Sequence, residues 1–562
     1  MRRALLIYAG LSVVLLGVGV AAHPATSTIG SDDLDFSSFV WFVSWWPHAL
    51  LAGREPLHTT FLFAPGGYNL AWAATVPALA LVAAPITLLG GPVVAYNALA
   101  VAAPVLAATG AFLLCRQVTG AVGPALVGGA VFGFSPYMMG NEQASALNLM
   151  HVGLVPVGAW LVLLRLDGRI TRPRFTAWLA LTLVIQFLIS PEVLATASLF
   201  GALLLVAGFA VFPQRRQPLR GLARPLAIAY GLLAVAVSPF LYAMFARPHL
   251  APALTATAPF SSDLLSLVVP SAPVGIGAGQ LSSLSARFPG GPLPAQHGFA
   301  YLGLPLLALL VVAVLPGAGR RSFDRRLRFV AAATLASALA SLGPRLHVAG
   351  DTLLPLPWAV LAHLPLLSYA IPSRMAMFTA LGAGLVLAGW LSARPSRSRW
   401  ALAAITLLLL VPAPSRFGRG LDEPTAYRDG RIAGLLRAED VVFAMPPFGA
   451  SMRWQAETGI AYRLAGGYAG TSFPADYLRL YCQLAAPHPD LRTLVRFLRA
   501  HGVTALLAPS GEEGYLARLD PQAPRTRIGG QSIVRLAPPP ATAPGGPLVT
   551  AGGALGHCPA SG

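Results

Sequence analysis

The sequence contains no lysine and few charged residues of any kind. Charged residues make up 11% of the 562 positions and hydrophobic residues 55%, which gives a mean hydropathy of +0.65. A composition this apolar excludes an ordinary soluble globular protein. The basic residues are all arginine, and many lie in short clusters between apolar runs. The net charge of +18 is therefore better explained by membrane topology than by binding of nucleic acid.

Cysteine is also scarce, and common signatures of enzymes are absent. Cys115, Cys482 and Cys558 are too scattered in the sequence to predict a metal site or a disulfide framework. No Walker spacing occurs, no GxGxxG follows a predicted strand, and neither HExxH nor a Ser/His/Asp elbow is present. The sequence therefore gives no indication of a nucleotide loop or of these hydrolase sites.

What the sequence does contain is a series of apolar runs between Leu5 and about Pro412. Each has roughly 17 to 23 residues, the length at which a helix crosses a hydrocarbon core about 30 Å thick. We therefore predict an α-helical polytopic membrane protein with about 11–13 transmembrane helices in residues 1–415. The first run could also be a signal peptide, because "VAA" before His23 resembles a cleavage site. We favour an uncleaved helix, since the parity of crossings requires it.

Arginine clusters predict the side of the membrane on which each loop lies, because short arginine-rich loops remain cytoplasmic. This rule places the N-terminus of a multi-pass plasma (inner) membrane protein in the cytoplasm. The segments 190–193, 246–298 and 346–372 and the chain after about residue 415 are then extracytoplasmic. The cytoplasmic clusters are Arg2 and Arg3; Arg165, Arg169, Arg172 and Arg174; Arg215, Arg216, Arg220 and Arg224; Arg320, Arg321, Arg325, Arg326 and Arg328; and Arg394, Arg397 and Arg399.

The same rule leaves one apolar segment too many after the first outer loop, which covers residues 23–71 and its interfacial helices. Only an odd number of crossings fits between this loop and the next cytoplasmic segment, yet 72–89 and 91–115 are both apolar. The shorter, proline-interrupted segment 72–89 is the candidate for a re-entrant or interfacial element. Backbone of that kind is tolerated where it lines a cavity in the protein.

Polar residues that matter for function should gather on the outer face. Asp32, Asp33 and Asp35 follow the first apolar run, beside "WFVSWWPHALL", which can also be interpreted as an aromatic interfacial belt. Glu192 lies where a helix begins, and an ionisable group there is costly unless it is paired or functional. Arg374 lies at the N-terminus of a transmembrane helix, where guanidinium and backbone N–H groups could clamp a phosphate. Snorkelling to lipid phosphate is the alternative for Arg374.

From residue 416 the composition becomes mixed and charged, with short β-like runs such as "DVVFAMPPF" and helical stretches such as "DLRTLVRFLRAHG". We predict a small α/β extracytoplasmic domain over residues 416–540. Residues 541–562, rich in proline, glycine and alanine, read as a disordered tail.

Several motifs together resemble a known group of proteins. Acidic residues in a first outer loop directly after the first helix, an aromatic interfacial helix, ten or more spans and a C-terminal outer domain together resemble the GT-C superfamily of membrane glycosyltransferases. More narrowly, "DDLDFSSFVWFVSWWPHALLAG", "YNALAVAAPVLAATGAFLLCRQVTG", "FGFSPYMMG", "ISPEVLATASLFG", "YLGLPLL" and "LPLPWAVLAHLPLLSYAIPSRM" resemble a group of actinobacterial membrane proteins related to that superfamily and to YfhO-type proteins. The resemblance implies a GT-C-like transmembrane domain and transfer of a sugar from a polyprenyl-phosphate donor. The acceptor would be a cell-envelope glycan, lipid or protein on the outer face.

The resemblance also implies roles for particular residues. Asp32 and Asp33 match the superfamily's acidic loop residues, which act as general base or hold the acceptor or a metal. A positioned carboxylate suits this reaction because the acceptor hydroxyl must lose a proton. Asp32 and Asp33 could also hold Mg²⁺ or Mn²⁺, although neighbouring carboxylates in a loop are commonly only solvated. The candidates for substrate binding are Asp35, Trp45, His58, Glu142, Glu192, His363 and Arg374.

Two other functions fit the same composition. A transporter or flippase of lipid-linked sugars would also be a polytopic membrane protein, but broken-helix sites at the midplane and internal repeats are not evident in the sequence. A non-catalytic membrane scaffold would make the outer acidic residues dispensable.

Overall fold

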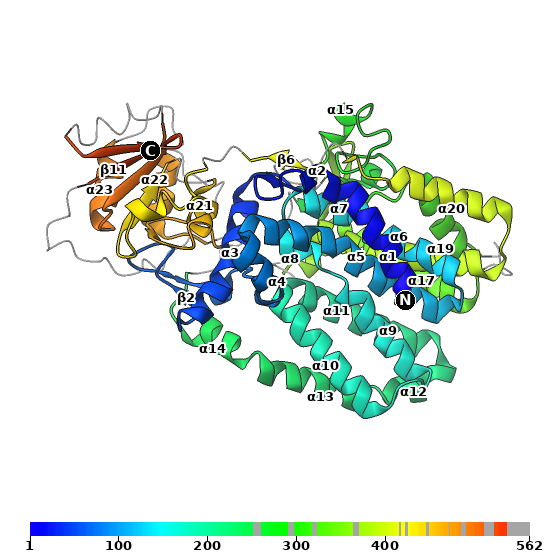
Figure 1. Cartoon of the computed structure of the whole chain (residues 1–562). Helices are drawn as coiled ribbons and strands as arrows, with labels where there is room; N and C mark the ends of the chain where they lie inside the picture. Colours follow the sequence, from blue (N-terminus) through cyan, green and yellow to red (C-terminus); the bar gives the residue numbers. More distant parts are fainter. Residues whose placement is uncertain are drawn as a thin grey trace.

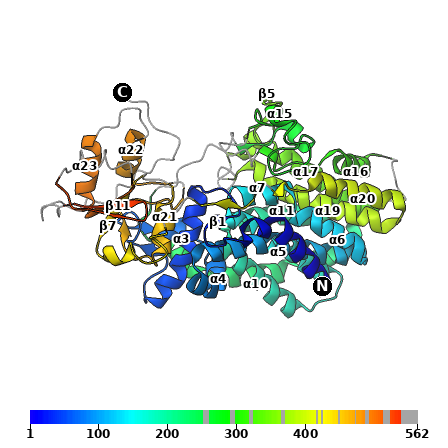
Figure 2. The same ribbon diagram turned by 45° about the horizontal axis from the view of Figure 1, so that its top comes forward.

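The computed structural model of the chain describes residues 1–250, 260–289, 297–316, 323–363, 370–414, 417–421, 425–445, 449–470, 472–484, 491–510 and 522–536. A body of helices carries a separate sheet-containing domain at one end (Figures 1 and 2). The predicted domain boundary at residues 415 and 416 and the predicted tail 541–562 lie outside the described residues.

The chain begins with one apolar helical rod. It comprises α1 (Arg2–Ser12), a π-helical turn (Val13–Gly17) and α2 (Val18–Ala21). Six helical segments are long and apolar enough to cross a membrane among the residues described, and a seventh results if one bent pair counts as a single span. The six are Arg2–Ala21, Pro92–Thr119, Val122–Gln143, Leu147–Leu166, Pro191–Val211 and Pro372–Ala393. The protein is therefore a multi-pass membrane protein.

Fewer segments meet both criteria than the predicted 11–13, for a reason visible in the other apolar helices. α16 (Leu304–Val314), α17 (Arg325–Ser341) and α20 (Arg397–Leu410) have 11, 17 and 14 residues. α10 (Arg172–Ile189) has 18 residues but begins with two arginines. By length and composition alone these helices are not identified as spans among the residues described, so the number of 11–13 crossings stays a prediction.

The first outer loop contains more regular structure than its sequence suggests. Its elements are β1 (Ser27–Thr28), α3 (Leu34–Leu51), β2 (His58–Thr59), β3 (Tyr68–Asn69) and a 3₁₀ turn, η2 (Leu70–Trp72). The helix α3 packs against α4 (Pro77–Gly90) and α5 (Pro92–Thr119). This loop is therefore part of the folded body.

The two apolar segments that follow the first outer loop, 72–89 and 91–115, correspond to α4 and α5 and differ in length, as predicted. With 14 residues, α4 rises about 21 Å, which is less than a hydrocarbon core of about 30 Å. With 28 residues, α5 rises about 42 Å. A left-handed Gly120 at φ 67° ends α5, and Pro92 stands in its first turn, both common terminal signals. α4 is therefore the shorter of the two, and its failure to span the membrane stays a prediction.

The helices of the central body follow in chain order. They are α6 (Val122–Gly133), α7 (Pro136–Gln143), α8 (Leu147–Met150), α9 (Leu154–Leu166), α10, α11 (Pro191–Val211), α12 (Arg216–Arg220), α13 (Ala223–Ala236) and α14 (Ser238–Ala246). After α14 come η5 (Leu264–Leu267), α15 (Ser282–Ser285), α16, α17, β4 (Arg345–Val348), β5 (Asp351–Pro355), α18 (Trp358–Leu361), η8 (Pro372–Met375), α19 (Ala376–Ala393) and α20.

The C-terminal domain is built on a five-stranded mixed sheet in the order β10-β11-β9-β7-β8. Its strands are β7 (Val441–Ala444), β8 (Arg463–Leu464), β9 (Ala505–Pro509), β10 (Arg525–Ile528) and β11 (Gln531–Arg535), and its helices are α21 (Ser451–Glu457), α22 (Ala475–Leu484) and α23 (Leu491–Ala500). All four residues of β7 are buried, as expected for a central strand. The prediction of a small α/β domain is confirmed.

The first outer loop extends this sheet at its β8 edge. The backbone N–H of Leu464 donates to Phe61 O at 2.9 Å, and Ala64 N–H donates to Leu464 O at 2.9 Å. Phe63 N–H donates to Gly466 O at 3.1 Å. A second antiparallel contact joins β1 to β6 (Arg419–Gly420). The C-terminal domain and the membrane body are therefore held together by backbone pairing as well as by side chains.

The aromatic run of α3 is buried instead of forming an exposed belt. Trp41, Trp45 and Trp46 are at most 6% exposed. Trp41 stacks on Trp45 with ring centroids 5.1 Å apart, and its indole N–H donates to Gln455 Oε1 at 2.5 Å. These rings pack α3 between the membrane body and the C-terminal domain, so they do not lie among lipid headgroups.

Candidate active site at the start of helix α3

The segment that carries the three aspartates forms the N-terminus of α3. Asp33 is the N-cap residue, and its Oδ1 accepts a hydrogen bond from Phe36 N–H at 3.0 Å. Its Oδ2 accepts from the Ser31 hydroxyl. A carboxylate in this position satisfies a helix N–H group and interacts favourably with the helix dipole. Both oxygens of Asp33 therefore have a structural role.

Asp32 points toward the C-terminal domain. Its Oδ1 accepts a hydrogen bond from Arg453 Nη1 at 2.5 Å. The Arg453 side chain is completely buried, whereas the Asp32 side chain is 36% exposed. The guanidinium also lies over the Phe36 ring, 5.5 Å from its centroid. This ion pair joins α21 to the start of α3.

Asp35, in the first turn of α3, faces a different set of groups. It is partly buried, and the Tyr468 hydroxyl donates a hydrogen bond to it. Burial, together with the negative charge of Asp33, raises the pKa of Asp35 to about 7, against the opposing effects of Tyr468 and the Arg374 charge. A carboxyl group whose pKa lies near neutral pH has the property expected of a general base.

The Arg374 charge that acts on Asp35 is itself anchored. Arg374 Nη1 donates to Glu192 Oε2, and both side chains are partly exposed. Arg374 lies in η8, immediately before the long helix α19, and Glu192 lies in the first turn of α11. The fold thus brings together groups from α3, α11, η8 and the loop after β8, which are separated by hundreds of residues in the sequence.

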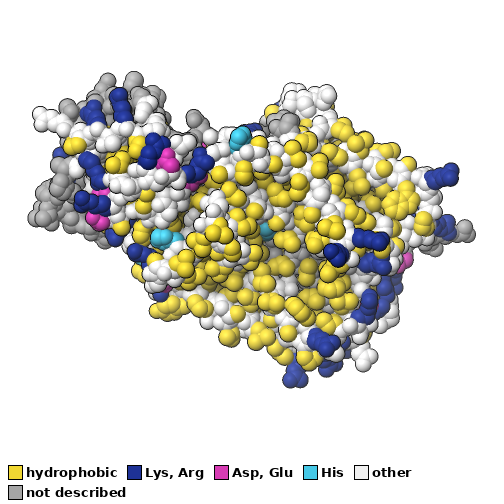
Figure 3. Space-filling view, in the orientation of Figure 1, with side chains coloured by type: hydrophobic (Ala, Val, Ile, Leu, Met, Phe, Trp, Pro, Cys, Tyr) yellow, Lys and Arg dark blue, Asp and Glu magenta, His cyan; other side chains and the backbone are white. Residues whose placement is uncertain are grey.

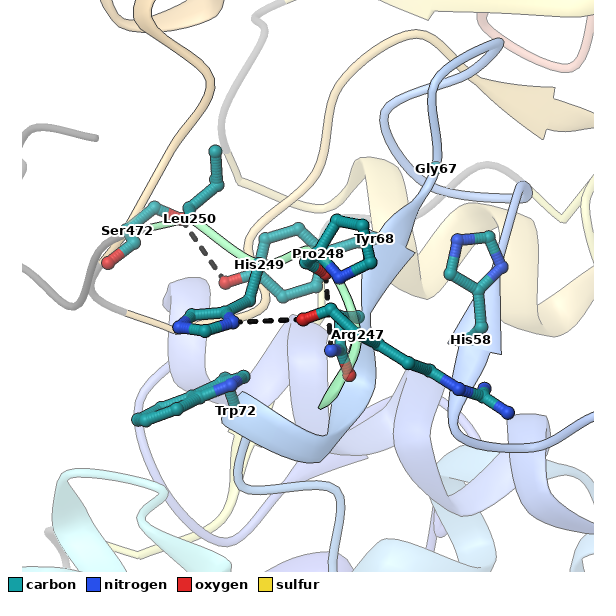
Figure 4. A pocket seen from close by; sticks show the side chains of 10 residues that line it. His58, Gly67, Tyr68, Trp72, Arg247, Pro248, His249, Leu250 and Ser472 are labelled. Carbon is teal, nitrogen blue, oxygen red and sulfur yellow. Dashed lines mark hydrogen bonds between the residues drawn. The ribbon is translucent and has the colours of Figure 1, made fainter. Parts of the chain in front are cut away.

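The other predicted binding residues lie apart from this group or inside the core. Trp45 is 1% exposed, and its indole N–H donates to Pro56 O at 2.9 Å. Glu142, on α7, is fully buried, and neither carboxylate oxygen has a hydrogen-bond partner among the residues described. His58 is exposed and lines a separate cavity (Figure 4). His363 is exposed after α18, and no described contact joins its side chain to Asp35.

The aspartates do not fit a metal site in their described arrangement. No group of three or more His, Cys, Asp or Glu side chains with suitable geometry occurs in the part of the chain that the structure describes. The oxygens of Asp33 accept from Ser31 and Phe36, and Asp32 binds Arg453. We therefore derive no step of the reaction through a metal.

Two residues of the site were missed by the sequence interpretation. Arg453 lies in "SMRWQAE" and Tyr468 in "AGGYAG", and neither sequence has a catalytic signature. A single arginine followed by tryptophan on a short helix is a weak sign of a buried ion pair. No local pattern could indicate that Tyr468 reaches Asp35, because that contact depends on how the C-terminal domain docks.

The Asp32–Arg453 pair predicts a measurable effect on docking. We expect Asp32→Asn to destabilise the C-terminal domain against the membrane body by about 1 to 3 kcal/mol, because it leaves a buried guanidinium without its carboxylate. The measurement is the rate of limited proteolysis between residues 410 and 440 together with the thermal midpoint in detergent. Asp429→Asn, in an exposed pair with Arg431, is the matched control and should leave both unchanged. Equal cleavage of the two variants would contradict this role.

A family model described as "Domain of unknown function (DUF6311)" matches residues 7–411, which is more than half of the chain. The chain belongs to the DUF6311 family. No curated protein matches the DUF6311 chain in sequence. The narrower likeness to actinobacterial and YfhO-type proteins remains a prediction.

Solved structures extend the comparison to the fold. The cryo-EM structure of arabinofuranosyltransferase AftD from Mycobacteria matches with a TM-score of 0.59 and 15% identity, covering 96% of this chain and 40% of that chain. The oligosaccharyltransferase of Archaeoglobus fulgidus matches with a TM-score of 0.51 and 14% identity, covering 91% of this chain and 69% of that chain. The DUF6311 protein spans less than half the length of AftD. At these identities the likeness shows that it has the fold of GT-C membrane glycosyltransferases.

Proposed function

We propose that this protein is a membrane glycosyltransferase that moves a sugar from a polyprenyl-phosphate donor to a cell-envelope acceptor on the outer face. The observation that carries the proposal is the pairing of a partly buried acid, Asp35, with a nearby anchored cation, Arg374. Transfer from a lipid phosphate requires both a proton acceptor and a positive charge for the departing phosphate. Support also comes from the fold, which is shared with two sugar transferases.

The proposed reaction assigns the proton to Asp35. An acceptor hydroxyl oxygen bonds to the anomeric carbon of the donor while its proton passes to a carboxylate oxygen of Asp35. The hydrogen bond from the Tyr468 side chain occupies one position on this carboxylate and fixes its orientation. Neighbouring Asp33 is less suited to this role, because protonation would remove its bond to Phe36 N–H or to Ser31. The earlier assignment of Asp32 and Asp33 as catalytic residues remains a prediction, which the variants below test.

The proposed role of Arg374 is to stabilise the departing polyprenyl phosphate. The bond between the anomeric carbon and the phosphate oxygen breaks, and the polyprenyl phosphate leaves with both electrons of that bond. A guanidinium stabilises the resulting negative charge more in the transition state than in the ground state, where that charge is smaller. Glu192 holds the guanidinium in place and leaves other N–H groups available for the phosphate.

The distribution of arginine supports the proposed sidedness. In Figure 3 a broad hydrophobic surface lies between two edges, one of which is the C-terminal domain. Dark-blue arginine side chains gather along the opposite edge, and others lie on the C-terminal domain itself. The arginine-rich edge lies over the ends of α9 and α12 and near the N-terminus, as the labels in Figure 1 indicate. By the positive-inside rule, this edge is cytoplasmic and the C-terminal domain is extracytoplasmic.

A transfer assay tests the proposal. Purified protein in nanodiscs is given a radiolabelled polyprenyl-phosphate sugar and an envelope-glycan acceptor fraction, and labelled acceptor and free polyprenyl phosphate are both measured. We expect the two products in equal amounts. If the donor is unchanged but labelled lipid crosses the bilayer of proteoliposomes, the protein is a transporter or flippase. If neither happens with arabinosyl, mannosyl or glucosyl donors, a scaffold is the better description.

A further inference from the structure

The chain contains a cavity outside the Asp35 group. It has a volume of about 140 Å³ and lies where the β2–β3 hairpin, the chain after α14 and the C-terminal domain meet. Figure 4 shows Trp72, His249, Tyr68, His58 and Arg247 around it, with Ser472 at one side. A cavity needs about 10 to 15 Å³ by this measure to hold one water, so the space corresponds to roughly ten waters. That is room for a single small ring.

The residues that line the cavity present aromatic faces together with hydrogen-bond donors and acceptors. Trp72 stacks on His249 with centroids 4.7 Å apart, and its N–H donates to Met244 O at 2.9 Å. Tyr68 donates to Ser472 O at 3.3 Å and keeps its own oxygen lone pairs as acceptors. His249 Nδ1 lies 3.1 Å from Arg247 O, which leaves Nε2 for another partner. Aromatic faces next to donors and acceptors suit a ring that has both C–H surfaces and hydroxyl groups.

The charges argue against an anionic ligand. Arg247 is the only fully ionised side chain among the residues that line the cavity, and it forms an ion pair with Glu55. It also lies over the Tyr242 ring, 5.6 Å from the centroid. Because Glu55 compensates this cation, the fully ionised side chains at the cavity contribute little net charge. A neutral ligand fits it better than a phosphate or a lipid headgroup.

The chain connects this cavity directly to the Asp35 group. Tyr468, which bonds to Asp35, is four residues before Ser472, which lines the cavity. Four residues span at most about 14 Å between Cα atoms even when fully extended. The cavity and the residue that bonds to Asp35 therefore lie within the length of a few linked sugar rings.

We propose that this cavity binds one sugar ring of a neutral oligosaccharide acceptor, while a hydroxyl of a neighbouring ring is presented to Asp35. The inference rests on the proposed function and narrows the acceptor from glycan, lipid or protein to a glycan of at least two sugars. The cavity then selects the acceptor, and the Asp35 group performs the transfer.

Binding without any donor tests this inference separately from transfer. Wild-type protein in phosphatidylcholine nanodiscs is titrated calorimetrically with neutral mono-, di- and tetrasaccharides of arabinofuranose, mannose and glucose. We expect one series to bind, with the tetrasaccharide at least tenfold tighter than the monosaccharide. Asp35→Asn keeps an oxygen acceptor for the presented hydroxyl, so its affinity for this series should fall by no more than about threefold while transfer is lost. Loss of transfer and loss of binding are therefore distinguishable.

Variants of the walls locate the site. We expect Trp72→Ala to weaken tetrasaccharide binding at least tenfold, and His58→Ala and Tyr68→Phe to weaken it about threefold to tenfold. His58 is exposed and has no described side-chain hydrogen bond, so its removal should not disturb folding. His23→Ala, at another exposed outer position, is the matched control.

Three results would overturn the inference. One is the absence of binding for every saccharide tested. Another is equal affinity in the His58, Tyr68 and His23 variants. The third is competition by millimolar inorganic phosphate or by phosphatidylglycerol nanodiscs, which would identify an anion site fed from solution or from lipid, respectively.

Discussion

Asp35→Asn is expected to lower the rate of sugar transfer by about a hundredfold to ten-thousandfold, the usual contribution of a positioned general base. Asparagine has nearly the same shape as aspartate but cannot accept the proton of the acceptor hydroxyl. Donor binding should change little, because Arg374 and Glu192 are retained. The measurement is kcat for release of polyprenyl phosphate from the labelled donor at saturating acceptor.

The neighbouring aspartates provide the controls for this prediction. Asp33→Asn should retain most activity, because asparagine is also a favourable N-cap residue and can still accept from Phe36 N–H. Asp32→Asn should act through docking of the C-terminal domain. Asp351→Asn, at an exposed position on β5, controls for loss of one negative charge. If Asp33→Asn is the inactive variant and Asp35→Asn is active, the base is Asp33.

The pH profile gives a second readout of the same residue. Because the pKa of Asp35 is raised to about 7, the carboxyl group is mostly protonated below pH 7 and cannot accept a proton. The value of kcat should therefore rise with pH, pass half its maximum near pH 7 and reach a plateau above it. A profile that is flat between pH 5.5 and 8.5 would show that no group with this pKa limits transfer.

The parts of the fold that sequence predicted well are those with local causes. Apolar runs identify helices because their length and hydrophobicity are set by the bilayer, and the short β-like runs identify the central strands of the C-terminal domain. The proline-interrupted segment before α5 is indeed a short helix. The number of full crossings stays a prediction, since α16 and α20, with 11 and 14 residues, are too short to be identified as spans by length alone.

The candidate site was predictable only in part, because only some of its contacts arise from residues that are close in sequence. Acids after the first helix and an arginine before α19 are visible in the sequence, and the structure places Asp35 within reach of the Arg374 charge. Which aspartate meets Tyr468 and the Arg374 charge depends on which residue caps the helix. Asp33 caps α3, so the side chain two residues later projects from the first turn. The contacts of Arg453 and Tyr468 arise only when residues more than 400 positions apart dock.

Arg374→Gln is expected to lower kcat about a hundredfold to a thousandfold, or about 2.7 to 4 kcal/mol, by analogy with removal of one donor that stabilises a developing negative charge. Glutamine keeps one hydrogen-bond donor group but loses the positive charge that the departing phosphate requires. Loss of this positive charge should also move the midpoint of the pH profile upward, because the Arg374 charge lowers the pKa of Asp35. Arg345→Gln, an exposed arginine on the outer hairpin, is the matched control.

Two further measurements separate a role at the phosphate from a merely structural pairing with Glu192. A donor analogue whose leaving group is a weaker base needs less stabilisation, so it should restore much of the activity of Arg374→Gln and none of that of Asp35→Asn. In the Glu192→Gln background, Arg374→Gln should still reduce kcat strongly, since the guanidinium acts on the donor. If Arg374→Gln has no additional effect there, and the analogue restores nothing, the arginine serves only to join α11 to η8.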